Sequence, residues 1–185
     1  MIEESQARYS TGAMILHWLI AIGVIANWRI AEAAHSAGSR EAGQAIMANH
    51  KAIGITILVL TLVRLAWRLV HKPPPLAAHL KTWERVLAKT THIVFYVLLL
   101  GLPLLGWLGQ AYFGGGVDMF GLFTMPALPV GDDPAAGKRM FELHHTGGTI
   151  IIYLLALHVI GALKHTLLDK DGNLFRMLPF GHPKA

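Results

Sequence analysis

The chain has 185 residues, of which 54% are hydrophobic and only 15% are charged, and its mean hydropathy is +0.47. A soluble domain of this length usually carries about a quarter charged residues, so the composition is typical of an integral-membrane domain. The absence of cysteine excludes disulfides, thiolate-bound iron–sulfur clusters and covalent c-type haem attachment.

Four stretches of the chain are long and apolar enough to cross a bilayer core of about 30 Å. They span residues 13–31, 50–70, 90–112 and 144–168 approximately. We expect an all-α fold, a transmembrane four-helix bundle in which residues 1–185 form a single integral-membrane domain. Prolines at 73–75 end the second span and glycines at 114–116 end the third. Residues 118–138 are predicted to form a long connection, of a kind that often carries a short surface helix.

The charges in the connections predict the orientation, because cytoplasmic loops carry an excess of Lys and Arg. The second-to-third connection is rich in basic side chains: Arg64, Arg68, Lys72, Lys81, Arg85 and Lys89. The third-to-fourth connection is richer in acidic ones: Asp118, Asp132, Asp133 and Glu142. Both termini are then cytoplasmic, in agreement with the basic residues near the C-terminus, which include Lys164, Lys170, Arg176 and Lys184. Because the basic residues lie beside the spans, the net charge of +5 does not indicate nucleic-acid binding.

A cleaved signal peptide is the alternative interpretation of the first span, since residues 31–34 resemble a small-residue cleavage site. Glu3 and Glu4 make the leading region acidic, however, whereas a signal peptide begins with a basic region. Cleavage would also discard His17. We therefore expect the first span to be retained.

Four histidines lie in the predicted spans. His17 lies near the start of the first and His50 at the head of the second, while His144 and His158 share the fourth. The last two are fourteen residues apart, which is about 21 Å along a helix and nearly the same helical face. The topology places His50 and His144 near the outer side, and His17 and His158 near the cytoplasm. These depths predict two b-type haems, each held by two imidazoles.

Two other histidines compete for the ligand positions, and an intramembrane histidine can also be a packed polar group or part of a proton relay. His145 is thirteen residues from His158, which turns it to nearly the opposite face from that residue. His165 would place its iron about 31 Å from that of His144, at the membrane surface. We therefore expect neither to be a haem ligand.

Other residues are candidates for binding the cofactors. Gly54 would clear space beside the haem ligand His50, although small residues are also common in ordinary helix packing. Arg64 and Arg68 share a helical face and could pair with haem propionates, or serve only as cytoplasmic anchors. His92 and His165 could donate hydrogen bonds to a quinone or carry protons, or could be interfacial side chains. Four basic side chains near the outer ends could pair with propionates or attract an anion: Arg40, Lys51, Lys138 and Arg139.

Over nearly its whole length, the chain resembles the bacterial cytochrome b561 family of four-helix, di-haem membrane proteins. The likeness rests on several short motifs: residues 15–19 (Ile-Leu-His-Trp-Leu), His50 with Gly54, residues 62–65 with Arg68, Leu102-Pro103 with Gly106, residues 120–122 and 125–126, and His144, His158 and His165. The resemblance implies that His17, His50, His144 and His158 are the haem ligands. It also implies a possible place for His165 at the quinone site.

The short stand-alone members of this family, to which the chain looks closer, include the superoxide oxidase. The resemblance therefore implies an oxidoreductase of the bacterial inner membrane, a superoxide:ubiquinone oxidoreductase with two haem b and no catalytic residue beyond the haems. It takes electrons from superoxide at the periplasmic face and passes them to ubiquinone. One departure is the loop at residues 114–118, because Asp118 at the expected entrance disfavours an anionic substrate.

Two other functions remain open at this point. The family also includes the b-type subunits of nickel hydrogenases and formate dehydrogenases, so the chain could be an electron-relay subunit with a periplasmic dehydrogenase or hydrogenase-type partner. That function predicts co-purification with the partner. A non-redox transporter with a histidine proton relay predicts no haem, and the absence of inverted repeats argues against it.

Overall fold

The computed structural model describes residues 8–76 and 80–181, which form four long helices, two short strands and one 3-10 helix. The long helices are α1 (Thr11–His35), α2 (Arg40–Val70), α3 (Thr82–Ala111) and α4 (Pro134–Leu167). A two-stranded antiparallel ladder, β1 (Val117–Asp118) with β2 (Thr124–Met125), lies between α3 and α4, and the 3-10 helix η1 (Asn173–Met177) follows α4. Glu3, Glu4 and Lys184, which the orientation and signal-peptide arguments used, lie outside the described residues.

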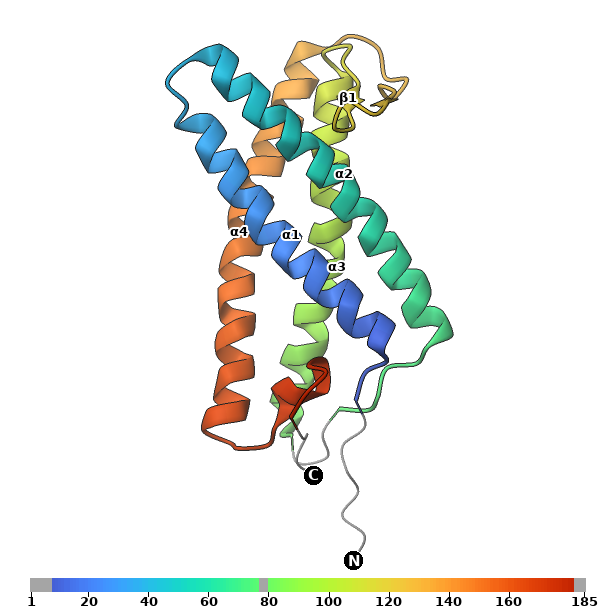
Figure 1. Ribbon diagram of the computed structural model, residues 1–185, viewed down its shortest axis with the longest axis vertical. Helices are drawn as coiled ribbons and strands as arrows, with labels where there is room; N and C mark the ends of the chain where they lie inside the picture. The colour runs from blue at the N-terminus through green and yellow to red at the C-terminus, as the bar shows by residue number, and fades with distance from the viewer. Residues whose placement is uncertain (1–7, 77–79, 182–185) are drawn as a thin grey trace, which may run out of the picture.

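The four helices pack as two helical pairs that face each other (Figure 1). Helix α1 packs against α2, α3 packs against α4, and α2 also contacts α3. One end of the bundle, which we call the hairpin end, carries the α1–α2 connection and the β1–β2 ladder. The opposite end, which we call the terminal end, carries the α2–α3 connection, the start of α1 and η1.

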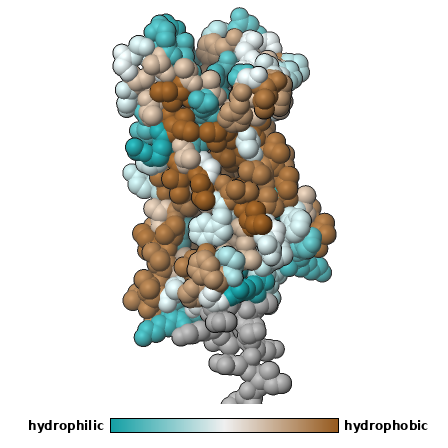
Figure 2. Space-filling model, in the orientation of Figure 1, coloured by the Kyte–Doolittle hydropathy of each residue, from teal (hydrophilic) through white to brown (hydrophobic). Residues whose placement is uncertain are grey.

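Each of the four helices is long and apolar enough to cross a membrane, which confirms the predicted all-α transmembrane fold. Large apolar side chains point outwards from the middle of the helices, and Ile22, Val97 and Leu157 are examples that are more than 60% exposed. Apolar residues gather over the middle of the face that Figure 2 shows, and polar residues gather towards its two ends. Lipid is the solvent that such a surface requires.

The helices are longer than the predicted spans. Only two residues of those spans lie outside the helices: Tyr112 and Leu168, which directly follow α3 and α4. Helices α2 and α4 each begin ten residues before the predicted span. The prediction that His50 and His144 head their helices is therefore wrong, and residues 134–138 belong to α4. The physical reason is helix capping: the Ser39 side chain accepts a hydrogen bond from Ala42 N, and the Asp133 side chain accepts one from Ala136 N.

A hairpin, rather than a surface helix, occupies the connection between α3 and α4. Its turn places Phe120 and Gly121 in the left-handed region, with φ of 58° and 73°, and the Asp118 carboxylate accepts a hydrogen bond from Gly121 N at 3.0 Å. Val117 and Met119 are buried against Ala52 and Ile55 of α2. The hairpin is therefore fixed across the flank of α2.

A close approach of α3 and α4 at the hairpin end depends on Gly137. A Cβ atom there would lie 2.6 Å from the Phe113 ring and 3.2 Å from the backbone oxygen of Gly109. We expect Gly137→Val to lower the free energy of unfolding by about 1–3 kcal/mol, because the backbone oxygen cannot move aside. Thermal unfolding in detergent should show a Tm lower by roughly 2–4 °C per kcal/mol. Gly101→Val in α3 is the control, since a Cβ there meets nothing within 4 Å, and equal loss in both variants would contradict the packing argument.

Candidate functional site

The structure brings together the two histidine pairs that the predicted depths indicated. His50 of α2 faces His144 of α4 near the hairpin end, with ring centroids 5.8 Å apart and an interplanar angle of 85°. His17 of α1 faces His158 of α4 near the terminal end, with ring centroids 6.4 Å apart and an angle of 70°. Both pairs cross the space between the two helical pairs, and α4 contributes one histidine to each.

Backbone carbonyls fix the orientation of the rings in the first pair. His50 Nδ1 lies 3.1 Å from the carbonyl oxygen of Asn27, and His144 Nδ1 lies 2.7 Å from that of Leu102. Because a carbonyl oxygen can only accept, Nδ1 carries the proton in both rings, and Nε2 keeps its lone pair. No described residue forms a hydrogen bond with either Nε2 atom. This is the arrangement in which an imidazole serves as a metal ligand.

A cavity of about 420 Å³ surrounds the first pair, and we call it the hairpin-side cavity. Besides the two histidines, its lining includes Gly54, Gly106, Gly148 and Lys51. A Cβ at Gly148 would meet nothing within 4 Å, and one at Gly54 would meet only the Asn27 amide nitrogen at 3.8 Å. The glycines therefore leave room for a large flat group beside the rings.

A second cavity of about 140 Å³, the terminal-side cavity, surrounds His17 and His158. Arg64, Arg68 and His92 line it as well, so the structure brings these predicted residues to the same place. The His92 ring centroid is 6.0 Å from that of His158, slightly closer than the ring centroid of His17 at 6.4 Å. The Arg64 guanidinium donates a hydrogen bond to the carbonyl oxygen of Ala13 at 2.7 Å, which ties α2 to the start of α1.

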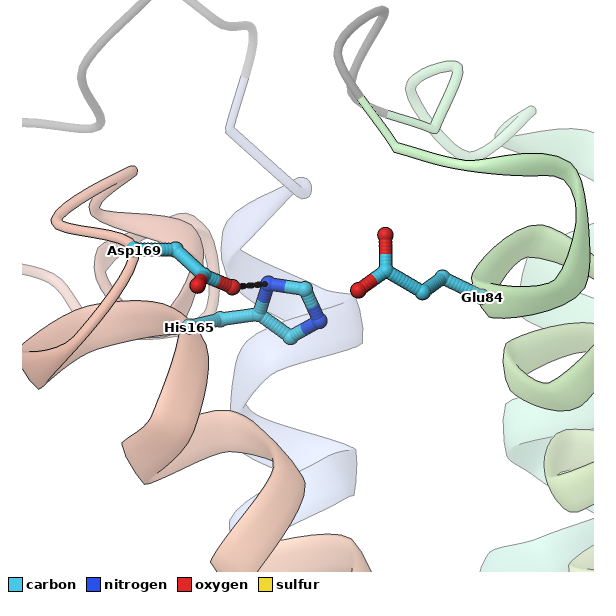
Figure 3. Close-up of side chains that lie close together, drawn as sticks. All are labelled: Glu84, His165 and Asp169. Atoms are coloured by element: carbon cyan, nitrogen blue, oxygen red, sulfur yellow. Dashed lines mark ion pairs between the residues drawn. The ribbon is translucent and has the colours of Figure 1, made fainter.

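His165 does not line either cavity. Its Nδ1 lies 2.9 Å from an Asp169 carboxylate oxygen and 3.0 Å from one of Asp171, so its ring is held at the end of α4. Glu84, from the first turn of α3, comes close to His165 and Asp169 (Figure 3). Lys164 lies 2.9 Å from Glu84 and 2.7 Å from Asp169, so its ammonium forms ion pairs with both carboxylates. The cluster joins α3 to α4 at the terminal end.

Paired imidazoles in apolar cavities, at two depths of a membrane bundle, are suited to b-type haem iron. The family model for prokaryotic cytochrome b561 matches residues 8–180. The chain belongs to the prokaryotic cytochrome b561 family. Its cofactor is therefore b-type haem, and its function is electron transfer in a membrane.

Three curated proteins that match nearly the full length of the chain agree with this family. Cytochrome b561 homolog 2 of Escherichia coli (strain K12) is 29% identical over 176 residues, which cover 92% of this chain and 91% of that protein. Cytochrome b561 homolog 1 of the same organism is 28% identical over 173 residues, 93% and 97% of the two chains. The probable superoxide oxidase CybB of Yersinia pestis is 29% identical over 172 residues, 93% and 96% of the two chains.

The residues present fit b-type haem, as the family requires. In the hairpin-side cavity, the Nδ1 protons of both imidazoles are bound by backbone carbonyls, which leaves Nε2 for the iron. Glycines form part of the cavity wall, and larger side chains at these positions would fill the space. The terminal-side cavity adds two guanidinium groups, Arg64 and Arg68, that can face carboxylates.

The groups that orient the histidines were not predicted from the sequence. The carbonyls of Asn27 and Leu102 are backbone atoms, so no residue-type signal could identify them. Asn27 itself lines the hairpin-side cavity, and its amide oxygen is buried without a hydrogen bond from any described residue. An asparagine within an apolar span was the available signal, because unpaired polar groups are costly there.

Gly106 gives His144 the space that its orientation needs. A Cβ at this position would lie 3.2 Å from His144 Nδ1 and 3.3 Å from Cε1, so a branched side chain must turn the ring away from Leu102. We expect Gly106→Val to lower the haem-to-protein ratio, measured as the pyridine haemochrome, while Gly101→Val retains the wild-type ratio. An unchanged ratio and spectrum in Gly106→Val would show that His144 is not held as described.

Proposed function

We propose that the protein is a di-haem b-type cytochrome that carries electrons across the bacterial inner membrane to ubiquinone. The proposed donor is superoxide at the periplasmic face, which makes the protein a superoxide:ubiquinone oxidoreductase. Residues 1–185 act as a single membrane domain. The observation that carries the proposal is the arrangement of two facing histidine pairs, one in each cavity, at two depths of one membrane bundle.

In this proposal His50 and His144 hold one haem in the hairpin-side cavity, and His17 and His158 hold the other in the terminal-side cavity. Bound in this way, the haems supply one-electron carriers without an open coordination site. The carbonyls of Asn27 and Leu102 keep one imidazole pair oriented. Arg64 and Arg68 line the terminal-side cavity, where they would pair with carboxylates of the second haem. Gly54 keeps the wall of the hairpin-side cavity open.

The charge distribution supports an orientation in which the hairpin end faces the periplasm and both termini are cytoplasmic. Basic residues of the α2–α3 connection lie at the terminal end, as positive-inside topology requires. Superoxide then arrives at the hairpin-side cavity, and quinone binds near the terminal-side cavity. His92 lines that cavity and can donate a hydrogen bond to a quinone oxygen, while His165 with Asp169 and Asp171 can carry protons at the membrane edge.

The proposed reaction balances without a further reagent. Two superoxide ions each lose one electron and leave as dioxygen. Ubiquinone accepts the two electrons and two cytoplasmic protons and becomes ubiquinol. The similarity to the probable superoxide oxidase of Yersinia pestis supports superoxide as the donor.

Removing single histidines tests the ligand assignment. We expect His50→Ala or His144→Ala to lower the haem content from two per chain to one, because the second pair remains intact. His17→Ala should remove the other haem, and the haem that remains should differ in midpoint potential from that in His50→Ala. Retention of both haems in either hairpin-side variant would show that the assignment is wrong. His145→Ala is the matched control, since His145 lines the same cavity but is not paired with His50.

Rapid mixing of the oxidised, purified protein with superoxide tests the function. We expect fast reduction of the haem absorption bands, followed by reoxidation when ubiquinone is present. Superoxide dismutase added beforehand should abolish the reduction. If superoxide leaves an intact di-haem spectrum oxidised, the protein is instead a relay subunit that takes electrons from a periplasmic redox donor.

A further inference from the structure

Lys51 places a positive charge at the hairpin-side cavity. It follows His50 directly on α2, precedes the apolar run that begins at Ala52, and lines the cavity beside the histidine pair. Of the four outer basic residues considered from the sequence, Arg40, Lys51, Lys138 and Arg139, only Lys51 is part of this lining. A half-buried ammonium inside a membrane bundle is costly, so its position calls for a function.

A neutral side chain from the neighbouring helix holds Lys51 in this position. The Lys51 Nζ donates a hydrogen bond of 3.1 Å to the amide oxygen of Gln110, near the end of α3. An amide oxygen satisfies one of the three ammonium donors but does not neutralise the charge. No carboxylate of the described residues forms an ion pair with Lys51. The charge and the remaining donors therefore stay available.

The loop after α3 folds back so that its glycines leave space for the Gln110 side chain. The Gln110 carbonyl accepts hydrogen bonds from Phe113 N at 3.1 Å and from Gly115 N at 3.2 Å, which folds the chain back over the helix end. A Cβ at Gly115 would overlap the Gln110 side-chain amide. The glycine-rich loop that follows α3 therefore leaves the Gln110 amide free to hold Lys51.

Two acidic groups lie near the hairpin-side cavity, and among the described residues neither forms an ion pair with Lys51. Asp118, which the sequence placed at the entrance, lies outside the cavity lining and accepts a hydrogen bond from Gly121 N within the hairpin. Glu32 does line the cavity, but it is solvent-exposed at the hairpin end. A fixed cation at a cavity with low-dielectric walls raises the local concentration of anions.

We propose that Lys51 is the anion-recognition residue of the hairpin-side cavity and that Gln110 is the positioning residue that holds it there. The anion it serves is a small oxygen anion arriving from solvent, and the identification of that anion as superoxide rests on the proposed function. Lys51 brings the anion beside the His50–His144 pair, and Gln110 acts only through Lys51.

Four variants test this inference by the second-order rate constant of haem reduction by superoxide, measured at several ionic strengths. Lys51→Gln should lower the rate constant about tenfold at low ionic strength and flatten its salt dependence. Lys51→Arg should keep most of the wild-type rate constant. Gln110→Leu should give a rate constant between those of the wild type and Lys51→Gln. Lys138→Gln is the matched control, because Lys138 is exposed outside the cavity and the net charge changes equally.

A second readout separates this inference from the proposed function. The dithionite-reduced protein, freed of excess reductant, is oxidised by anionic hexacyanoferrate(III) or by a cationic cobalt(III) phenanthroline complex. Lys51→Gln should lower the anion-to-cation rate ratio more than Lys138→Gln does. If superoxide does not reduce the wild-type protein, the proposed function fails, and this ratio still decides the role of Lys51.

Two results would overturn the inference. If Lys51→Gln and Lys138→Gln change the rate constant and the anion-to-cation rate ratio equally, only the net charge of the protein matters. Loss of one haem from Lys51→Gln, with normal retention in Lys51→Arg, would assign Lys51 to a carboxylate of the bound cofactor rather than to an anion from solvent. Haem content and reduction by ubiquinol, which reaches the other cavity, show whether each variant is correctly folded.

Discussion

The N–H groups of the histidines need partners inside a bundle that is surrounded by lipid, and much of the architecture follows from how they find them. An unpaired polar group in an apolar environment costs several kcal/mol. His50 and His144 meet this need with main-chain oxygens of α1 and α3, which are two helices that do not carry them. Each bond therefore fixes a ring and at the same time sets the position of one helix against another. The histidine–carbonyl hydrogen bonds thus hold the helices together and also orient the imidazoles inside the hairpin-side cavity.

Helix α4 joins the two sites because it contributes a histidine to each. The fourteen residues from His144 to His158 set their separation, about 21 Å, by helix geometry alone. The other partner in each pair comes from a different helix, His50 from α2 and His17 from α1. A change in the tilt of α4 would thus move a histidine of both pairs. Helix α1 supplies a histidine, His17, to one pair and only a backbone partner, the Asn27 carbonyl, to the other. The packing of α3 along α4, which Lys164 and its carboxylate partners close at the terminal end, restrains this tilt.

The sequence predicted the four helices and the histidine pairing because both depend on regular features: apolar length, a helical period and the sign of loop charges. It failed where the structure depends on local or distant partners. The starts of α2 and α4 were missed, since caps at Ser39 and Asp133 extend both helices with polar turns beyond the apolar runs. The partners of His165 were also missed, since a turn with Lys170 and Gly172 at positive φ returns Asp171 to its ring. The carbonyl partners of the histidines carry no residue-type signal.

Both ends of the described chain contribute to one cavity, and this has a consequence for biosynthesis. Tyr9 and Met177 line the terminal-side cavity, and the C-terminal segment is fastened to α1 where the Trp18 indole donates a hydrogen bond of 2.8 Å to the Met177 carbonyl. The lining of the hairpin-side cavity, in contrast, is complete by Ile151. A growing chain therefore finishes the walls of one cavity while the other still lacks its last segment. If each cavity takes one haem, as proposed, the hairpin-side site could be filled during synthesis, whereas the terminal-side site would close only after the segment around Met177 had been made.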